Sequence, residues 1–196
     1  MSKINSICVF CGSKSGSDPQ YHESAQELGR LLAERNITLV YGGGSVGLMG
    51  IIADAVLAAG GKVIGVIPRQ LATRELLHPG VEEMHVVEDM HTRKAKMAEC
   101  SDAFIAMPGG FGTLEELFEV VSWVQLGIYL KPIGLLNTSG FYDPLLNLVE
   151  HCIETEFIKP KYRDLIIADD TPATLVDHLE KHQLPHIEKI LSLKQS

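Results

Sequence analysis

Apolar residues along the chain alternate between two patterns. Short runs are apolar at nearly every position, over residues 6–10, 38–41, 62–67, 85–87, 103–107, 133–136 and 165–168. Between these runs, apolar residues recur at helical spacing, over residues 19–35, 48–59, 90–100, 114–125, 144–155 and 172–182. Short apolar strands separated by helices are typical of a parallel sheet that is covered on both faces. The pattern therefore predicts an α/β fold of this kind.

The length of the chain fits one domain. Its 196 residues suit a single α/β unit, and a hydrophobic share of 45% allows a sizeable core. The chain contains no internal repeat and no linker-like stretch, so we expect residues 1–196 to form one domain. The segment after about residue 185 follows a proline and is expected to be flexible.

The charge balance excludes some classes of partner. The formal net charge is −8 and the isoelectric point is about 5.4. Nucleic acid and anionic membrane surfaces need a basic face, so neither is expected as a partner. The N-terminal residues lack the apolar region of a signal peptide, and no stretch is long enough to span a membrane. These features predict a cytoplasmic protein.

Glycine-rich and polar loops follow the predicted strands. They cover residues 11–16, 42–44, 68–69, 89–94 and 108–113. In open parallel sheets, ligands bind beyond the carboxyl ends of the strands. Because these loops all fall at that edge, they indicate a ligand that carries phosphate.

Residues 42–47, Gly-Gly-Gly-Ser-Val-Gly, match the pattern GxGxxG between a strand and a helix. Glycines there let the backbone approach a phosphate at the helix N-terminus. A dinucleotide site also needs an acid after the next strand, but that strand ends with Pro68 and Arg69. A dinucleotide site, a tight turn and a mononucleotide site all remain open, and the missing acid disfavours an NAD(P)-dependent oxidoreductase.

Residues 108–116, Pro-Gly-Gly-Phe-Gly-Thr-Leu-Glu-Glu, form a second motif. Thr113 and Glu116 have the spacing of a capping box, which would give them a purely structural role at the start of a helix. That role leaves the three glycines before Thr113 unexplained, because glycine costs backbone entropy unless a tight turn or a ligand requires it.

Arg93 is placed unusually for a structural cation. It falls in the opening turns of a predicted helix, where cations oppose the helix dipole. At helical spacing it shares the apolar face with Met97 and Cys100. A guanidinium buried there needs an anionic partner. The alternative is an arginine that extends to solvent from the edge of the core.

No metal and no cofactor are expected. Cys8 and Cys11 form a lone CxxC pattern within a strand, and residues at that spacing point to opposite faces. His178, His182 and His186 are four residues apart, but Pro185 interrupts the helix before the third.

Together the motifs resemble the LONELY GUY family, the cytokinin riboside 5′-monophosphate phosphoribohydrolases, whose relatives were long mislabelled as lysine decarboxylases. The resemblance rests on PGGxGTxxE at residues 108–116 and on the Arg93–Lys94 pair. Residues 11–13 and 41–50 add to it, and it extends over about residues 7–156. It implies a homodimeric Rossmann-like fold and hydrolysis of a nucleoside 5′-monophosphate to a free base and ribose 5-phosphate.

Residue roles also come from this resemblance. It makes Arg93 and Glu116 catalytic. The substrate contacts that it implies, with Ser13 added as a helper for the phosphate, are Ser13, Glu75, Lys94, Gly110, Phe111, Gly112, Thr113, Leu114, Glu115 and Ser122. Ser122 stands where plant members usually have threonine, which keeps the hydroxyl and loses a methyl group.

Two other functions remain as alternatives to the hydrolase. A non-catalytic nucleotide or cofactor carrier would use the same glycine loops, and an NAD(P)-dependent oxidoreductase is the less favoured one. The decarboxylase label is weak, because a pyridoxal enzyme needs a Schiff-base lysine. Common decarboxylases of that type carry it after histidine, and this chain has no His-Lys dipeptide.

Overall fold

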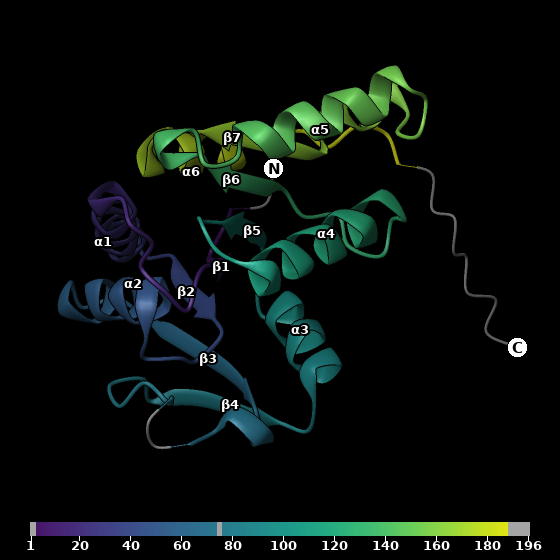
Figure 1. Ribbon diagram of the computed structural model, residues 1–196. Coiled ribbons are helices and arrows are strands. Elements are labelled where there is room, and N and C mark those ends of the chain that lie inside the picture. The colour runs from purple at the N-terminus through teal and green to yellow at the C-terminus, as the bar shows by residue number, and fades with distance from the viewer. Residues whose placement is uncertain (1–2, 74–75, 188–196) are drawn as a thin grey trace, which may run out of the picture.

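The computed structural model describes residues 3–73 and 76–187. Strands and helices alternate along the chain (Figure 1). The strands are β1 (Ser6–Phe10), β2 (Thr38–Tyr41), β3 (Val63–Pro68), β4 (Glu83–Val87), β5 (Ala103–Ala106), β6 (Ile133–Leu136) and β7 (Ile166–Asp169). The α-helices are α1 (Pro19–Glu34), α2 (Gly47–Ala58), α3 (Met90–Glu99), α4 (Phe111–Gln125), α5 (Asp143–Glu154) and α6 (Pro172–Lys181). Short 3-10 turns occupy Arg69–Leu71, Thr138–Gly140 and Pro160–Leu165.

The strands form one sheet in the order β4-β3-β2-β1-β5-β6-β7, and every pairing is parallel. Strand β1 is central and pairs with both β2 and β5. Successive strands are added in one direction from β1 to β4 and in the other from β5 to β7. The direction therefore reverses between β1 and β5, where open α/β sheets bind their ligands. The predicted α/β fold with a parallel sheet is confirmed.

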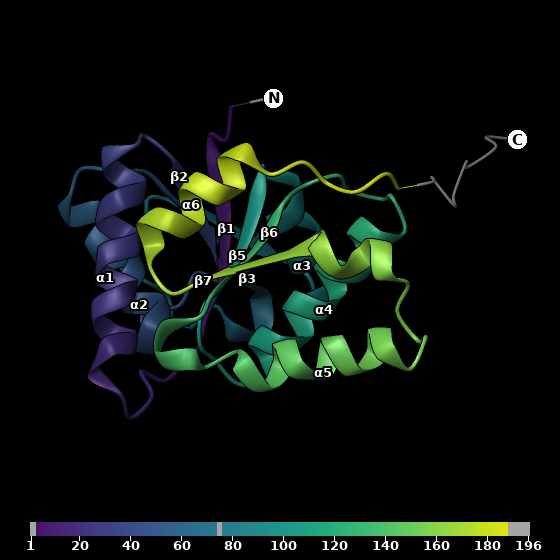
Figure 2. The same cartoon turned by 90° about the horizontal axis from the view of Figure 1, so that it is seen from above.

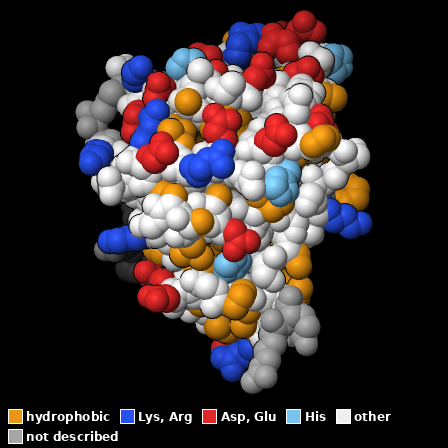
Figure 3. Space-filling model, turned by 90° about the vertical axis from the view of Figure 1, so that its left-hand side faces the viewer, with side chains coloured by type: hydrophobic (Ala, Val, Ile, Leu, Met, Phe, Trp, Pro, Cys, Tyr) orange, Lys and Arg blue, Asp and Glu red, His pale blue; other side chains and the backbone are white. Residues whose placement is uncertain are grey.

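Helices cover both faces of the sheet, as Figure 2 shows from above. On one face, buried residues of α1, α2 and α6, such as Leu28, Ile52 and Leu175, pack against the strands. On the other face, Met97 of α3 and Leu117 of α4 pack against the second set of strand side chains. Acidic and basic side chains are interspersed over the surface formed by α1 and α2 (Figure 3).

One helix begins earlier than the pattern predicts. Residues 114–125 were the expected range, but α4 starts at Phe111 with Gly110 as its N-cap. Gly110 has extended backbone angles (φ −98°, ψ −156°) and provides no side-chain cap. Thr113 therefore lies inside the first turn, and the capping-box interpretation of Thr113 and Glu116 is wrong.

Candidate active site

Helices α3 and α4 bring Arg93 and Glu116 together. Helix α3 is capped by Asp89, whose carboxylate accepts from the Thr92 N–H at 2.7 Å, so Arg93 enters the core one turn later. Arg93 Nη1 donates to Glu116 Oε1 at 2.8 Å. The two side chains are only 11% and 10% exposed. Arg93 Nε also donates to the carbonyl of Val66 in β3, at 3.0 Å, so Arg93 has the anionic partner that its buried position requires.

The surroundings of Glu116 change its acidity. Burial raises the pKa of Glu116 above its usual value of 4.5, and the Arg93 guanidinium only partly offsets this effect. A carboxylate with a raised pKa can accept a proton near neutral pH more readily than an exposed one. Glu116 is thus a buried carboxylate whose properties suit proton transfer or the stabilisation of a positive charge.

The first glycine of residues 42–47 makes room for Arg93. A Cβ atom at Gly42 would lie 2.1 Å from Arg93 Nη2 and 3.2 Å from the Met49 sulfur. Any other residue would displace the guanidinium from this position. The GxGxxG match is therefore explained at its first position by a close approach of a protein side chain.

The N-terminus of α2 is covered by the loop that follows β1. The Leu48 N–H donates to the Gly12 carbonyl at 3.0 Å. Gly47 has φ +60°, and a Cβ atom there would lie 2.3 Å from the carbonyl carbon of Ser13. Protein backbone therefore packs where a phosphate would have to approach α2.

The N-terminus of α4 is open. The first N–H groups of a helix have no acceptor within the helix, which makes this end an anion site. Cβ atoms at Gly110 and Gly112 would meet nothing within 4 Å. Beneath them, Thr113 is buried, and its Oγ1 would lie 2.1 Å from a Cβ atom at Gly109. The glycines thus let the loop pack closely on Thr113 while its other side faces open space.

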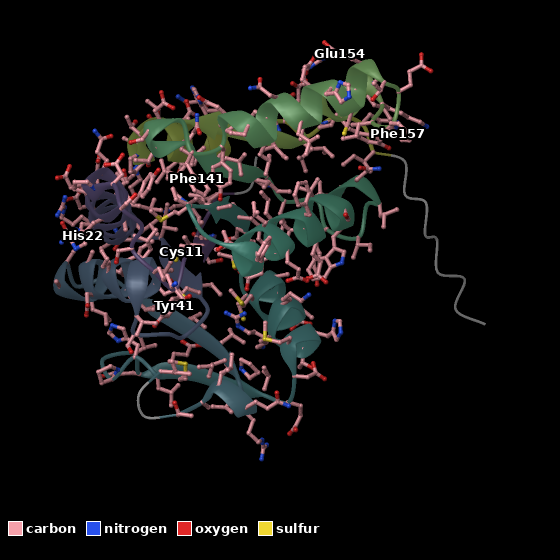
Figure 4. The ribbon with its side chains drawn as sticks, in the orientation of Figure 1. Cys11, His22, Tyr41, Phe141, Glu154 and Phe157 are labelled. Carbon is pink, nitrogen blue, oxygen red and sulfur yellow. The ribbon has the colours of Figure 1, made fainter. Side chains whose placement is uncertain are left out.

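A cavity of about 340 Å³ lies at the reversal point between β1 and β5. Ser13 and Gly110, both predicted substrate contacts, line it, with Tyr21, Leu48 and Phe141 as larger walls. Figure 4 labels Cys11 and Phe141 near this end of the sheet. A larger hollow of about 480 Å³ lies between α1 and α2, but no predicted site residue lines it. We therefore assign the ligand crevice to the smaller cavity.

Comparison with known proteins identifies the family. The family model described as "possible lysine decarboxylase" matches residues 49–179. A cytokinin riboside 5′-monophosphate phosphoribohydrolase from Arabidopsis thaliana is 52% identical over 193 residues, which cover 98% of this chain and 90% of the relative. A second such enzyme from the same plant is 49% identical, covering 94% and 87%. The chain belongs to the LONELY GUY family.

Solved structures with this fold include proteins of other names. The molybdenum cofactor binding protein from Rippkaea orientalis has a TM-score of 0.70 and 22% identity, covering 92% of this chain and 98% of that one. A molybdenum cofactor carrier protein from Chlamydomonas reinhardtii has a TM-score of 0.67 and 21% identity, covering 91% and 97%. At this identity the likeness shows a shared fold alone.

The second cation of the LONELY GUY motif is held inside the protein. Lys94 is 7% exposed, and its Nζ lies 2.5 Å from Glu115 Oε1 and 3.0 Å from Glu119 Oε2. Burial opposes the charge of Lys94, but the two carboxylates outweigh it and raise the pKa of this side chain. Lys94 and Glu115 therefore form a second ion pair, next in sequence to the Arg93–Glu116 pair on the same two helices.

The remaining predicted contacts are spread along α4. Phe111 is 93% exposed at the start of the helix, and Leu114 lines an apolar groove on its outer side. Ser122 is exposed, with its hydroxyl donating to the carbonyl of Phe118 at 2.7 Å. Ser122 does not line the crevice at the reversal point, and neither do Arg93, Lys94 and Glu116. Glu75 lies outside the described residues.

Two functional features were missed by the sequence reasoning. The first is Glu119, which pairs with Lys94. It lies four residues, about one helical turn, after Glu115, and this spacing could have indicated that both carboxylates share one face of the helix. The second is the contact of Gly42 with Arg93, which had no local signal in the sequence because the two residues are far apart in the chain.

Among the described residues, no helix is long and apolar enough to cross a membrane, and no group of three His, Cys, Asp or Glu side chains could hold a metal ion.

Proposed function

We propose that this protein hydrolyses the N-glycosidic bond of adenosine 5′-monophosphate-type nucleotides, releasing a free base and ribose 5-phosphate. Its relatives carry the name of cytokinin riboside 5′-monophosphate phosphoribohydrolases. The observation that carries the proposal is the buried Arg93–Glu116 pair beside the open N-terminus of α4. Plain AMP and its N6-isopentenyl analogue are both proposed substrates.

Glu116 is the proposed catalytic carboxylate. Loss of the base builds positive charge on the ribose, and a carboxylate beside the anomeric carbon can stabilise that charge and orient or deprotonate water. Arg93 is a poor proton donor because guanidinium stays charged. Its bond to Glu116 instead fixes the carboxylate and holds its charge in a buried position.

The phosphate of the substrate is proposed to bind at the start of α4. The N–H groups of Phe111, Gly112 and Thr113 point out of the helix end, and Gly110 leaves their approach unobstructed. Ser13 lines the same crevice and supplies a hydroxyl donor. We further propose that Lys94 and Glu115 act near the substrate through their ion pairs, and that Leu114, Ser122 and Glu75 are further contacts.

A homodimer is proposed as the working state. Phe118 and Leu148 are exposed and line an apolar groove of about 350 Å³ on α4 and α5, and Phe111 is exposed at the start of α4. Exposed apolar surfaces of this kind mark protein–protein interfaces. A second copy covering this face would also close the start of α4.

The proposed location is the cytosol. The four cysteines are free, which fits a reducing compartment.

Release of adenine from AMP by the purified protein, followed by chromatography, tests the proposed function. The expected products are free base and ribose 5-phosphate, formed without added metal and unchanged by EDTA. Tight binding of AMP without release of base would instead support a nucleotide carrier. Decarboxylation of lysine is not expected, because the chain has no His-Lys dipeptide, and the pKa of Lys94, the lysine beside the Arg93–Glu116 pair, is raised, whereas a Schiff-base lysine must lose its proton.

A further inference from the structure

A short backbone clip holds the glycine loop beneath Arg93. We call residues 76–81 the clip loop. The His78 N–H donates to the Gly43 carbonyl at 3.1 Å, and the Ser45 N–H donates to the Leu76 carbonyl at 2.9 Å. The clip loop therefore pairs with residues 43–45 as a small antiparallel bridge, outside the main sheet.

The side chain of His78 fastens the clip loop to α2. It is only 5% exposed, and both of its ring nitrogens have partners. Nδ1 accepts from the Gly80 N–H at 3.2 Å, so Nε2 carries the proton and donates to Asp54 Oδ1, also at 3.2 Å. Asp54 belongs to α2, so a single imidazole joins the clip loop to that helix.

The glycine loop is in turn one wall of the Arg93 site. Gly42 contacts the guanidinium so closely that no Cβ atom fits, and Gly43 has φ +75°, a conformation that favours glycine. A loop of three glycines is entropically costly to hold in one conformation. The clip loop supplies the hydrogen bonds that hold it.

We propose that His78 is a positioning residue for catalysis. Through Asp54 and Gly80 it holds the clip loop, the clip loop holds residues 43–45, and the adjoining Gly42 keeps the Arg93 guanidinium aligned with Glu116. This role rests on the proposed hydrolase function. A displacement of about 1 Å at a reacting group can lower a rate on the order of a hundredfold, so loosening the wall should be visible in kcat.

Kinetics of three variants test this chain of contacts. His78→Ala and Asp54→Ala are each expected to lower kcat for AMP about tenfold or more. Asp54→Asn keeps an oxygen that accepts from Nε2, so it should retain kcat within about twofold of the unmodified protein. His85→Ala is the matched control, because His85 Nε2 also lies 3.2 Å from a carboxylate, Glu83 Oε1, but on an exposed strand. It should leave kcat unchanged.

A second readout does not depend on turnover. The Arg93 Nε–H bond to the Val66 carbonyl gives a side-chain NMR signal whose shift and exchange rate report the position of the guanidinium. His78→Ala and Asp54→Ala should move this signal or speed its exchange, and His85→Ala should not. If His78→Ala does not fold, Asp54→Ala carries the test, because Asp54 is largely exposed. Normal kcat and an unmoved Arg93 signal in folded Asp54→Ala would overturn the proposal, whereas an inactive unmodified protein with a responsive signal would overturn only the hydrolase function.

Discussion

Replacing Glu116 by glutamine separates its chemical role from its structural one. Glutamine has nearly the same shape and keeps an oxygen that can accept from Arg93 Nη1, the bond that measures 2.8 Å in the native protein. It removes the negative charge and the ability to take a proton. A positioned acid or base contributes about 10²–10⁴-fold to a rate, so kcat of Glu116→Gln should fall by about that factor.

The expected change in stability is small, because two effects of the substitution oppose each other. Burial raises the pKa of Glu116 in the folded protein, so above that pKa the ionised group is less favourable when folded than when unfolded. A neutral glutamine removes this cost, which offsets the weaker bond to Arg93. Glu116→Ala is different, because it leaves a buried guanidinium without a partner, at a cost of about 3–5 kcal/mol.

Thermal unfolding and steady-state kinetics on the same preparations decide the outcome. At about 2–4 °C per kcal/mol for a chain of this size, Glu116→Ala should melt well below the native protein and Glu116→Gln close to it. Glu150→Gln is a matched control, since Glu150 pairs with Arg163 on the surface, where such pairs contribute about 0–1 kcal/mol. A folded Glu116→Gln variant with kcat within a few-fold of native would refute the catalytic role.

Four further predictions follow from the site and its surroundings. AMP should be preferred over adenosine by about a hundredfold or more in kcat/KM, because two or three hydrogen bonds to the phosphate contribute about 1.5–3 kcal/mol each; equal values would exclude phosphate binding at α4. The kcat/KM profile should rise with pH through a pKa above 4.5, as Glu116 must ionise to act; a limb at or below 4.5 would contradict this. Phe118→Glu should give a monomer by analytical ultracentrifugation, whereas Phe157→Glu, the same substitution at a more exposed phenylalanine just beyond α5, should not. Tyr142→Phe removes the buried 2.7 Å hydrogen bond from the Tyr142 hydroxyl to the Met107 carbonyl and should lower the free energy of unfolding by about 1 kcal/mol. Tyr41→Phe should leave it unchanged, because the buried Tyr41 hydroxyl (Figure 4) has no hydrogen-bond partner among the described residues. Equal free energies of unfolding for the two variants would contradict this.

The strands and helices were predictable because their signals are local. Apart from β4, the strands are largely apolar runs between polar or glycine-rich loops, and all the observed strand ranges agree with the expected ones to within two residues. The start of α4 was missed by three residues, because helix caps are usually predicted from side chains. Gly110 caps α4 without a side chain, whereas Thr113 is a residue type that often caps helices, so the sequence predicts a start just after Thr113.

The candidate site was only partly predictable for a different reason. The apolar face of α3 showed that Arg93 would be buried and would need an anion, but nothing local identified Glu116 as that anion. The partner comes from a helix that follows a different strand. The pattern at residues 42–47 leaves a ligand site and a tight turn both open, because spacing alone cannot show that a side chain from another helix occupies the space above Gly42.

The two cations of the family motif are both neutralised within the protein, which bears on how an anionic substrate can bind. Arg93 is paired with Glu116, and Lys94 is paired with Glu115 and Glu119. In a chain of net charge −8, neither cation can therefore provide long-range attraction for a phosphate. The proposed phosphate site would therefore rely on groups that act at contact distance, and the first N–H groups of α4, which have no acceptor within the helix, are such groups. The ion pair with Arg93 fixes the Glu116 carboxylate in place, so under the proposed mechanism the charge nearest the ribose would be the negative one that bond cleavage requires.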